Sequence, residues 1–410
     1  MGQATLTYKS AAKNTSALNA WFTYVAASAI LLGFGGYTTK SLLAASRQPF
    51  RVLGSFYASG SAALHHLNPY AFYPLTWQFH PYDLKELQVI YDVNLSPPCM
   101  LPLFSALAHF PIHTLLPWWT AISVMLFVAS AGIVLAEMKR KIQKRQIVWL
   151  LLSASVFDTI LLCQDYSLLL LLATLAWLFT VRGNKLSAAV VIGILVAFKP
   201  NLGFWPILLL VSGRVKPAVL SLCTAGTLTV FPIFMYGPSI YHEWLHASSV
   251  VPHWIYTTDV SLAGIFTRLG SRAIGVALAS LCAVMLLYLT RKLQPTEVQV
   301  AGIAICMGMV CAPLAWYQYC LFAAPFFVGL RHWTWVETTA AALLSVPVFF
   351  ERWALAKGRL IQFLYGLPHY VGLWIMLGIF LYAAFEMRKS DERSAEISSE
   401  AMQLHVELVA

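Results

Sequence analysis

Lys199 is the residue of this chain whose surroundings point most directly to chemistry. It stands in Lys199-Pro200-Asn201, which interrupts an apolar stretch running from Ser187 to Val211. A lysine in such a stretch is costly unless it reaches the interface, pairs with an anion or meets an anionic ligand. An ammonium is a compact point charge that suits phosphate. The sequence therefore predicts a phosphate clamp at Lys199, and a lysine that only extends to the interface from a helix end is the alternative.

Two other polar interruptions separate pairs of strongly apolar segments. Gln164 and Asp165 follow Cys163, and Gln318 lies between Tyr317 and Tyr319. A simple polar turn explains each of them when they are considered singly. We nevertheless retain Gln164, Asp165 and Gln318 as candidate substrate-binding residues.

A long segment, residues 38–96, mixes aromatic residues, histidines and prolines with apolar residues. This composition suits short helices that lie on a membrane surface. An interfacial aromatic belt without a catalytic task would explain most of its tyrosines and tryptophans. It explains the three acids of the segment less well, and these are Asp83, Glu86 and Asp92.

The composition places the chain in a membrane. Of its 410 residues 59% are hydrophobic and only 11% are charged. Apolar runs near the ~20 residues needed to cross a bilayer recur along nearly the whole length. We therefore predict an all-α polytopic membrane protein with about 11–13 membrane segments. The Lys199-Pro200-Asn201 break predicts two short helices rather than one straight span.

The formal net charge of +10 reflects membrane orientation and does not indicate nucleic-acid binding. Basic residues gather in short loops between the apolar runs, most densely in residues 139–145. By the positive-inside rule these loops face the cytoplasm. The seven cysteines have neither CxxC spacing nor histidine partners, so we expect no disulfide framework and no metal site.

This orientation divides the chain into a cytoplasmic N-terminal segment (1–19), a membrane domain (20–385) and a cytoplasmic tail (386–410). Residues 38–96 and 237–272 are then external. Residues 97–136 look like two apolar segments broken at Pro111 and Pro117, and one of them, Met100–Phe110, is expected to enter the membrane without spanning it.

Four polar interruptions fall on the external side in this topology: residues 83–94, 164–165, 199–201 and 317–319. They could converge on one outward-facing cavity that holds a cation for phosphate and carboxylates for acid/base work. That is the layout of a transferase acting on a lipid-phosphate sugar.

Several short elements, in this order and spacing, resemble glycosyltransferase family 87, a group that depends on polyprenyl-phosphate mannose. They are Phe56-Tyr57-Ala58-Ser59-Gly60 with Asn68-Pro69-Tyr70, Asn94 with Pro97-Pro98, Gln164 before a leucine-rich span, and Ala197-Phe198-Lys199-Pro200. The resemblance covers roughly residues 20–385. It implies a GT-C fold, a polyprenyl-phosphate-linked donor, a lipid or glycan acceptor and an inverting transfer at the external face of a multi-pass bacterial plasma-membrane protein. We add Tyr57 and Asn94 to the candidate binding residues.

The chain departs from this family at the expected general base. An aspartate shortly before the aromatic pair is implied, but Arg51-Val52-Leu53-Gly54 stands there, and no acid precedes Asp83. Asp92 is our first candidate for this role, because it lies close to Asn94 where the external segment re-enters the membrane. Asp83 and Glu86 are the next candidates. The histidine that some members carry near Trp316 is also absent.

Two other classes of protein remain open. A transporter or flippase of lipid-linked sugars would use the same lysine to bind without reaction, although the sequence shows no inverted repeats. A catalytically inactive relative would bind polyprenyl phosphate only. No DxD motif indicates a nucleotide-sugar donor with a metal, so no cofactor is expected.

Overall fold

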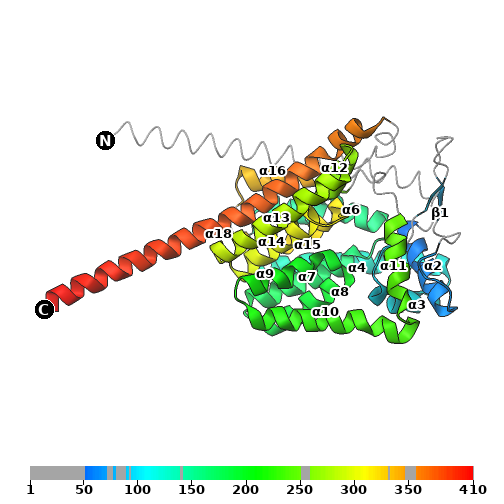
Figure 1. Cartoon of the computed structure of the whole chain (residues 1–410), viewed down its shortest axis with the longest axis horizontal. Coiled ribbons are helices and arrows are strands. Elements are labelled where there is room, and N and C mark those ends of the chain that lie inside the picture. The colour runs from blue at the N-terminus through cyan, green and yellow to red at the C-terminus, as the bar shows by residue number, and fades with distance from the viewer. Residues whose placement is uncertain are drawn as a thin grey trace.

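The computed structural model describes residues 51–71, 77–79, 89–91, 94–138, 142–250, 259–330, 333–346 and 357–409. Within these ranges the chain is a helical bundle (Figure 1). The strands described are β1 (Trp77–Phe79) and β2 (Val89–Tyr91), which pair antiparallel with Trp77 opposite Tyr91. The all-α membrane fold is thus confirmed, with one small hairpin added to it.

Four of the described helices are long and apolar enough to cross a membrane. They are α4 (Ile112–Met138), α10 (Val215–Tyr236), α13 (Arg272–Leu293) and the portion Arg359–Ser394 of α18 (Arg359–Val409). Large apolar side chains on them face outward, and Phe234 is 82% exposed. A contiguous apolar exterior of this kind matches a lipid environment.

Shorter helices complete the bundle. They are α2 (Arg51–Leu64), η2 (Pro98–Met100), α3 (Leu101–Ala108), α5 (Lys144–Leu152), α6 (Ala154–Leu161), α7 (Tyr166–Val181), α8 (Lys185–Phe198), η4 (Pro200–Gly203), α9 (Phe204–Val211), α11 (Ser239–Val250), α12 (Leu262–Arg268), α14 (Glu297–Val310), η6 (Tyr317–Tyr319), α15 (Cys320–Val328) and α16 (Trp335–Leu344). Every residue of α15 is buried, as is α14 from Gln299 to Val310. Helices that are apolar on all sides belong in the interior of a membrane bundle, and these two form its centre.

Two expectations concern residues 97–136: a break at Pro117, and a segment Met100–Phe110 that enters the membrane without spanning it. The expected break at Pro117 is wrong, because α4 runs through this proline. Pro117 is the sixth residue of α4, and proline is tolerated inside membrane helices because neighbouring groups satisfy the main-chain carbonyl that it frees. The segment before α4 forms α3, whose 8 residues span only about 12 Å. That length is well short of a ~30 Å hydrocarbon core.

α2 is buried within the protein. The composition of residues 38–96 had instead suggested short helices that lie on the membrane surface. The Phe56 and Phe104 rings stack with centroids 4.5 Å apart, and Leu53 is fully buried. Gly60 lets the two helices approach closely, because a Cβ at this position would overlap the main-chain carbonyl of Phe104. α2 and α3 therefore form a second small core with η2 and α11.

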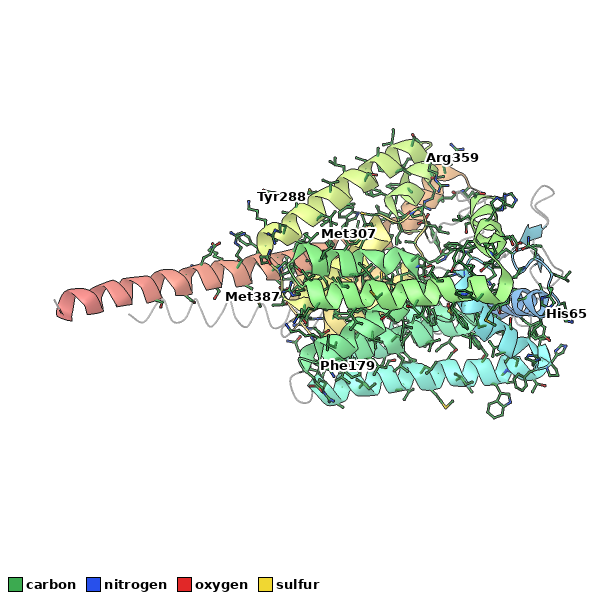
Figure 2. The ribbon with its side chains drawn as sticks, turned by 60° about the horizontal axis from the view of Figure 1, so that its bottom comes forward. His65, Phe179, Tyr288, Met307, Arg359 and Met387 are labelled. Atoms are coloured by element: carbon green, nitrogen blue, oxygen red, sulfur yellow. The ribbon has the colours of Figure 1, made fainter. Side chains whose placement is uncertain are left out.

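The two ends of the bundle differ. α2, α3, α11 and the hairpin gather at one end, and α18 projects from the other (Figure 1). Figure 2 places His65, just after α2, and Phe179, near the end of α7, at opposite ends. α7 therefore begins on the α2 side, where the main-chain N–H of Val52 donates to the carbonyl of Leu162 (3.2 Å).

The end opposite α2 carries ion pairs between helix termini. Lys185 at the start of α8 contacts Glu297 at the start of α14 (2.7 Å), and Arg182 after α7 contacts Glu137 in α4 (2.7 Å). α18 continues without interruption across residue 386, the predicted start of the cytoplasmic tail. The assignment of external and cytoplasmic faces stays a prediction.

Candidate functional site

Lys199 lies at the junction of α8 and η4. α8 ends at Phe198 because Pro200 cannot continue it and disfavours helical geometry in the residue before it. Lys199 itself has φ −139° and ψ 88°, and its main-chain N–H donates to Leu195 (2.8 Å). Two short helices thus meet at this break, as predicted.

Two tyrosines enclose the Lys199 ammonium. Its Nζ lies 4.8 Å from the ring centroid of Tyr166 and 5.2 Å from that of Tyr319. The two rings meet edge to face with centroids 5.3 Å apart. Aromatic faces attract a cation, most strongly where water is excluded. The Lys199 side chain is half-buried, so the ammonium is held while part of the side chain stays accessible.

Asp165 is the anionic neighbour of Lys199. It directly precedes α7, is 2% exposed, and interacts electrostatically with the ammonium. Neither carboxylate oxygen has a hydrogen-bond partner among the described residues. A buried carboxylate normally receives several donors, because leaving one unpaired is unfavourable. The charge of Lys199 is therefore the main compensation that Asp165 receives.

Gln318 directly precedes Tyr319 on η6. Its Nε2 donates to Oδ2 of Asp158 on α6, and its Oε1 is buried with no hydrogen-bond partner in the described structure. Asp158 was missed by the sequence reasoning. The signal was available, because Asp158 is an acid within the apolar run 147–163, and such acids are rare unless they serve a purpose.

Three of the four predicted interruptions therefore come together. Asp165 precedes α7, Lys199 follows α8, and Gln318 with Tyr319 lies on η6. Gln164 is half-buried, and its main-chain N–H donates to Thr159 (3.0 Å).

Asn94 belongs to the neighbouring small core and not to the Lys199 cluster. Its Nδ2 donates to Oγ of Ser59 (2.9 Å), and its Oδ1 accepts from the N–H of Ser96 (2.9 Å). Both ends of the amide are thus occupied within the protein. Tyr57, half-buried, packs against the same small core. The two regions touch where Sγ of Cys99 donates to the carbonyl of Ala197 (2.9 Å), two residues before Lys199.

The three acids proposed for proton transfer lie outside the described residues. They are Asp83, Glu86 and Asp92. Between residues 72 and 93 the structure describes β1 and β2, and β2 ends at Tyr91.

A second buried charge pair holds the start of η6 in place. Oδ1 of Asp259 accepts from the N–H groups of Ser261 and Ala315, both at 3.0 Å. Arg268 donates from Nη2 to the main-chain oxygen of Asp259 (2.5 Å) and to the Tyr370 hydroxyl. Burial raises the pKa of Asp259, and the charge of Arg268 opposes that rise.

This arrangement links α12, α18 and the residues just before η6. Sequence reasoning missed both charges. Their partners are distant in the sequence, which left no local pattern to detect.

The cluster as a whole suits a singly charged phosphate ester. It offers one ammonium, two aromatic faces, an amide oxygen and buried acids. In the part of the chain that the structure describes, no group of three His, Cys, Asp or Glu residues could hold a metal ion.

Comparison with known proteins gives one match. A family model described as glycosyltransferase family 87 matches residues 94–316, just over half of the chain. No curated protein and no solved structure matches the chain significantly. The matched range contains Asp165 and Lys199, and it ends at Trp316, the residue before η6.

Proposed function

The chain belongs to glycosyltransferase family 87, and on that premise we propose the identity of its donor, acceptor and reaction. The donor is a polyprenyl-phosphate-linked hexose, with mannose as the sugar we favour. The acceptor is a glycolipid or a glycan at the external face of a cell membrane, which we take to be a bacterial plasma membrane. The transfer inverts the configuration at the anomeric carbon.

The observation that supports this proposal is the position of Lys199. Its ammonium lies between two tyrosine rings at a break between helices, on the α2 side of the bundle. When the bond between the anomeric carbon and the phosphate oxygen breaks, negative charge builds up on the phosphate. A fixed cation at that point stabilises the transition state more than the ground state. The polyprenyl chain would extend from the phosphate along the apolar helices into the lipid.

Deprotonation of the acceptor hydroxyl requires a base on the opposite side of the sugar. We assign this role to Asp92, with Asp83 and Glu86 as the other candidates of the same segment. An inverting transfer needs no covalent sugar intermediate, so one carboxylate suffices. The unpartnered Oε1 of Gln318 would accept a hydroxyl of the sugar, and Gln164 lies next to Asp165 at the same break.

Tyr57 and Asn94 take supporting roles in this proposal. The Asn94 amide is used within the small core, so it would position the main chain beside the proposed site and would not contact the donor itself. Tyr57 would contact the acceptor where that core meets the end of α8.

A transfer assay tests the proposed function. The purified chain in lipid nanodiscs is incubated with polyprenyl-phosphate [³H]mannose and a total membrane lipid extract as acceptor. We expect label to move into acceptor lipid in parent samples and not in Lys199→Met samples. Lys216→Met is the matched control, because Lys216 is exposed at the start of α10. Donor binding without transfer would indicate the inactive relative, and passage of intact donor across a sealed bilayer would indicate the transporter.

A further inference from the structure

Asp165 has an unusual position among the buried acids of this chain. Asp259 receives two main-chain N–H groups, and Asp158 receives the amide of Gln318. Both oxygens of Asp165 are buried without any such donor in the described residues. Its negative charge therefore depends on the nearby ammonium of Lys199.

The groups around Asp165 offer little other compensation. Tyr166 on α7 and Tyr319 on η6 are phenols, which are ordinarily uncharged near neutral pH. The Asp158 carboxylate on α6 is bonded to Gln318, and the Cys163 thiol precedes the break. Of the charged groups described here, Lys199 alone carries the opposite sign and interacts with Asp165.

A bound phosphodiester changes this balance. The resting pair carries one positive and one negative charge, and the phosphodiester adds a second negative charge next to the same ammonium. A buried site avoids an uncompensated charge by changing its protonation state. Asp165 is the acid that has no hydrogen-bond donor among the described residues. The site therefore stabilises the charged form of Asp165 less than that of its other groups.

We propose that a phosphodiester bound at Lys199 takes up the positive charge that otherwise compensates Asp165, and that Asp165 takes up one proton from solvent in the same step. An O–H bond forms on the Asp165 carboxylate, and no other bond changes. The protonated acid is then a hydrogen-bond donor within the site and can bond to a phosphate oxygen. This inference rests on the proposed function, because it requires that Lys199 binds the donor phosphate.

The same charge balance bears on selectivity between donor and product. The donor is a phosphodiester with one negative charge, whereas the leaving polyprenyl phosphate is a monoester that carries close to two near neutral pH. One ammonium beside a neutral acid provides one positive charge, which matches the single negative charge of the donor. The product brings a further charge that this pair does not compensate, which favours its release.

Calorimetry with a phosphodiester that does not itself titrate tests the proposal. Farnesyl-phosphoryl-mannose is titrated into the detergent-solubilised full chain, in two buffers of different ionisation enthalpy. The difference between the two heats gives the number of protons taken up for each ligand bound. We expect the parent to take up close to one proton, and its affinity to fall by up to ~10-fold for each unit of rising pH.

Variants assign the proton to a residue. Asp165→Asn should take up no proton and should bind at about pH 8 as tightly as the parent or more tightly. Lys199→Arg, whose guanidinium keeps its charge throughout this range, should retain the proton uptake and so exclude the lysine as its source. Elution profile and thermal midpoint confirm that each variant is folded.

The possible failures are distinguishable. If the folded parent does not bind the phosphodiester, the proposed function fails and this inference with it. If the parent binds and Lys199→Met loses binding, but Asp165→Asn takes up the same proton, this inference alone is overturned. A loss of affinity of ~10-fold or more in Asp165→Asn would also overturn it, because the carboxylate would then be needed in its charged form.

Discussion

Gly308 on α14 lies directly against the main chain of Asn201 in η4. A Cβ at residue 308 would stand 2.5 Å from the Asn201 carbonyl oxygen, closer than non-bonded atoms can approach. Asn201 follows the Lys199-Pro200 break, so the helix at the centre of the bundle sets the position of η4. The direction of the Lys199 side chain therefore depends on a glycine more than a hundred residues further along the chain.

Gly308→Ala should disturb this contact and displace Lys199. We expect farnesyl-phosphoryl-mannose binding to weaken by at least ~10-fold, since a displaced main chain moves the ammonium away from the tyrosine rings. Gly203→Ala is the matched control, because a Cβ there meets nothing within 4 Å. Equal affinity of the two variants would show that η4 does not depend on α14 for its position.

Lys199→Met should leave the fold intact or stabilise it, while phosphate binding is lost. Replacing a charge that is partly removed from water by an apolar side chain of similar length is often neutral or favourable for stability. In this variant Asp165 loses the positive charge that compensates it. This loss opposes the gain in stability unless Asp165 becomes protonated. Thermal unfolding followed by tryptophan fluorescence, beside the binding assay, gives both quantities. A variant that binds the phosphodiester as the parent does would remove Lys199 from the site.

Asp92→Asn should lower the rate of sugar transfer at least ~100-fold, which is the low end expected for loss of a general base. Donor binding should be unchanged, because the base acts on the acceptor hydroxyl. Glu86→Gln is the comparison, and its effect should be much smaller. Comparable rates for Asp92→Asn and the parent would place the base elsewhere.

Topology is checked by labelling single cysteines with a membrane-impermeant maleimide in cells. In a background where the exposed Cys223 is replaced by serine, His246→Cys on α11 should react from outside intact cells. Lys141→Cys should react only after permeabilisation, because the basic loop is predicted to face the cytoplasm. Reaction at residue 141 from outside would show that the predicted orientation is reversed. The site at Lys199 would then face the cytoplasm.

Gly60→Ala should destabilise the small core formed by α2 and α3. The added methyl group would overlap the Phe104 carbonyl, so the helices must move apart. We expect a loss of about 1–3 kcal/mol in the free energy of unfolding. Gly132→Ala provides the opposite control, since nothing lies within 4 Å of that position on α4 and alanine favours a helix. Both changes can be followed by thermal unfolding in the same detergent.

The sequence predicted those features that follow from local chemistry. Pro200 after a lysine in an apolar run required a break, and the structure has two short helices there. The polar residues at 164–165 and 318 were expected on one side of the membrane with Lys199, and these three come together.

Features that depend on distant partners could not be predicted. Arg268 reaches Tyr370, 102 residues away, and Gln318 reaches Asp158, 160 residues away. The Asn94 amide hydrogen-bonds to Ser59 within the small core. This contact also depends on packing and has no local sequence pattern. Pro117 misled in the other direction, because a proline inside a membrane helix does not always break it.

The parts of the Lys199 cluster are far apart in the sequence, and this has a consequence for biogenesis. Asp165 and Lys199 are made and inserted well before Tyr319 and Gln318. Until η6 arrives, the ammonium lacks one of its two aromatic faces and α6 keeps an acid without its amide partner. A ribosome-bound chain that ends before α14 should therefore hold its early helices in the bilayer without a competent site.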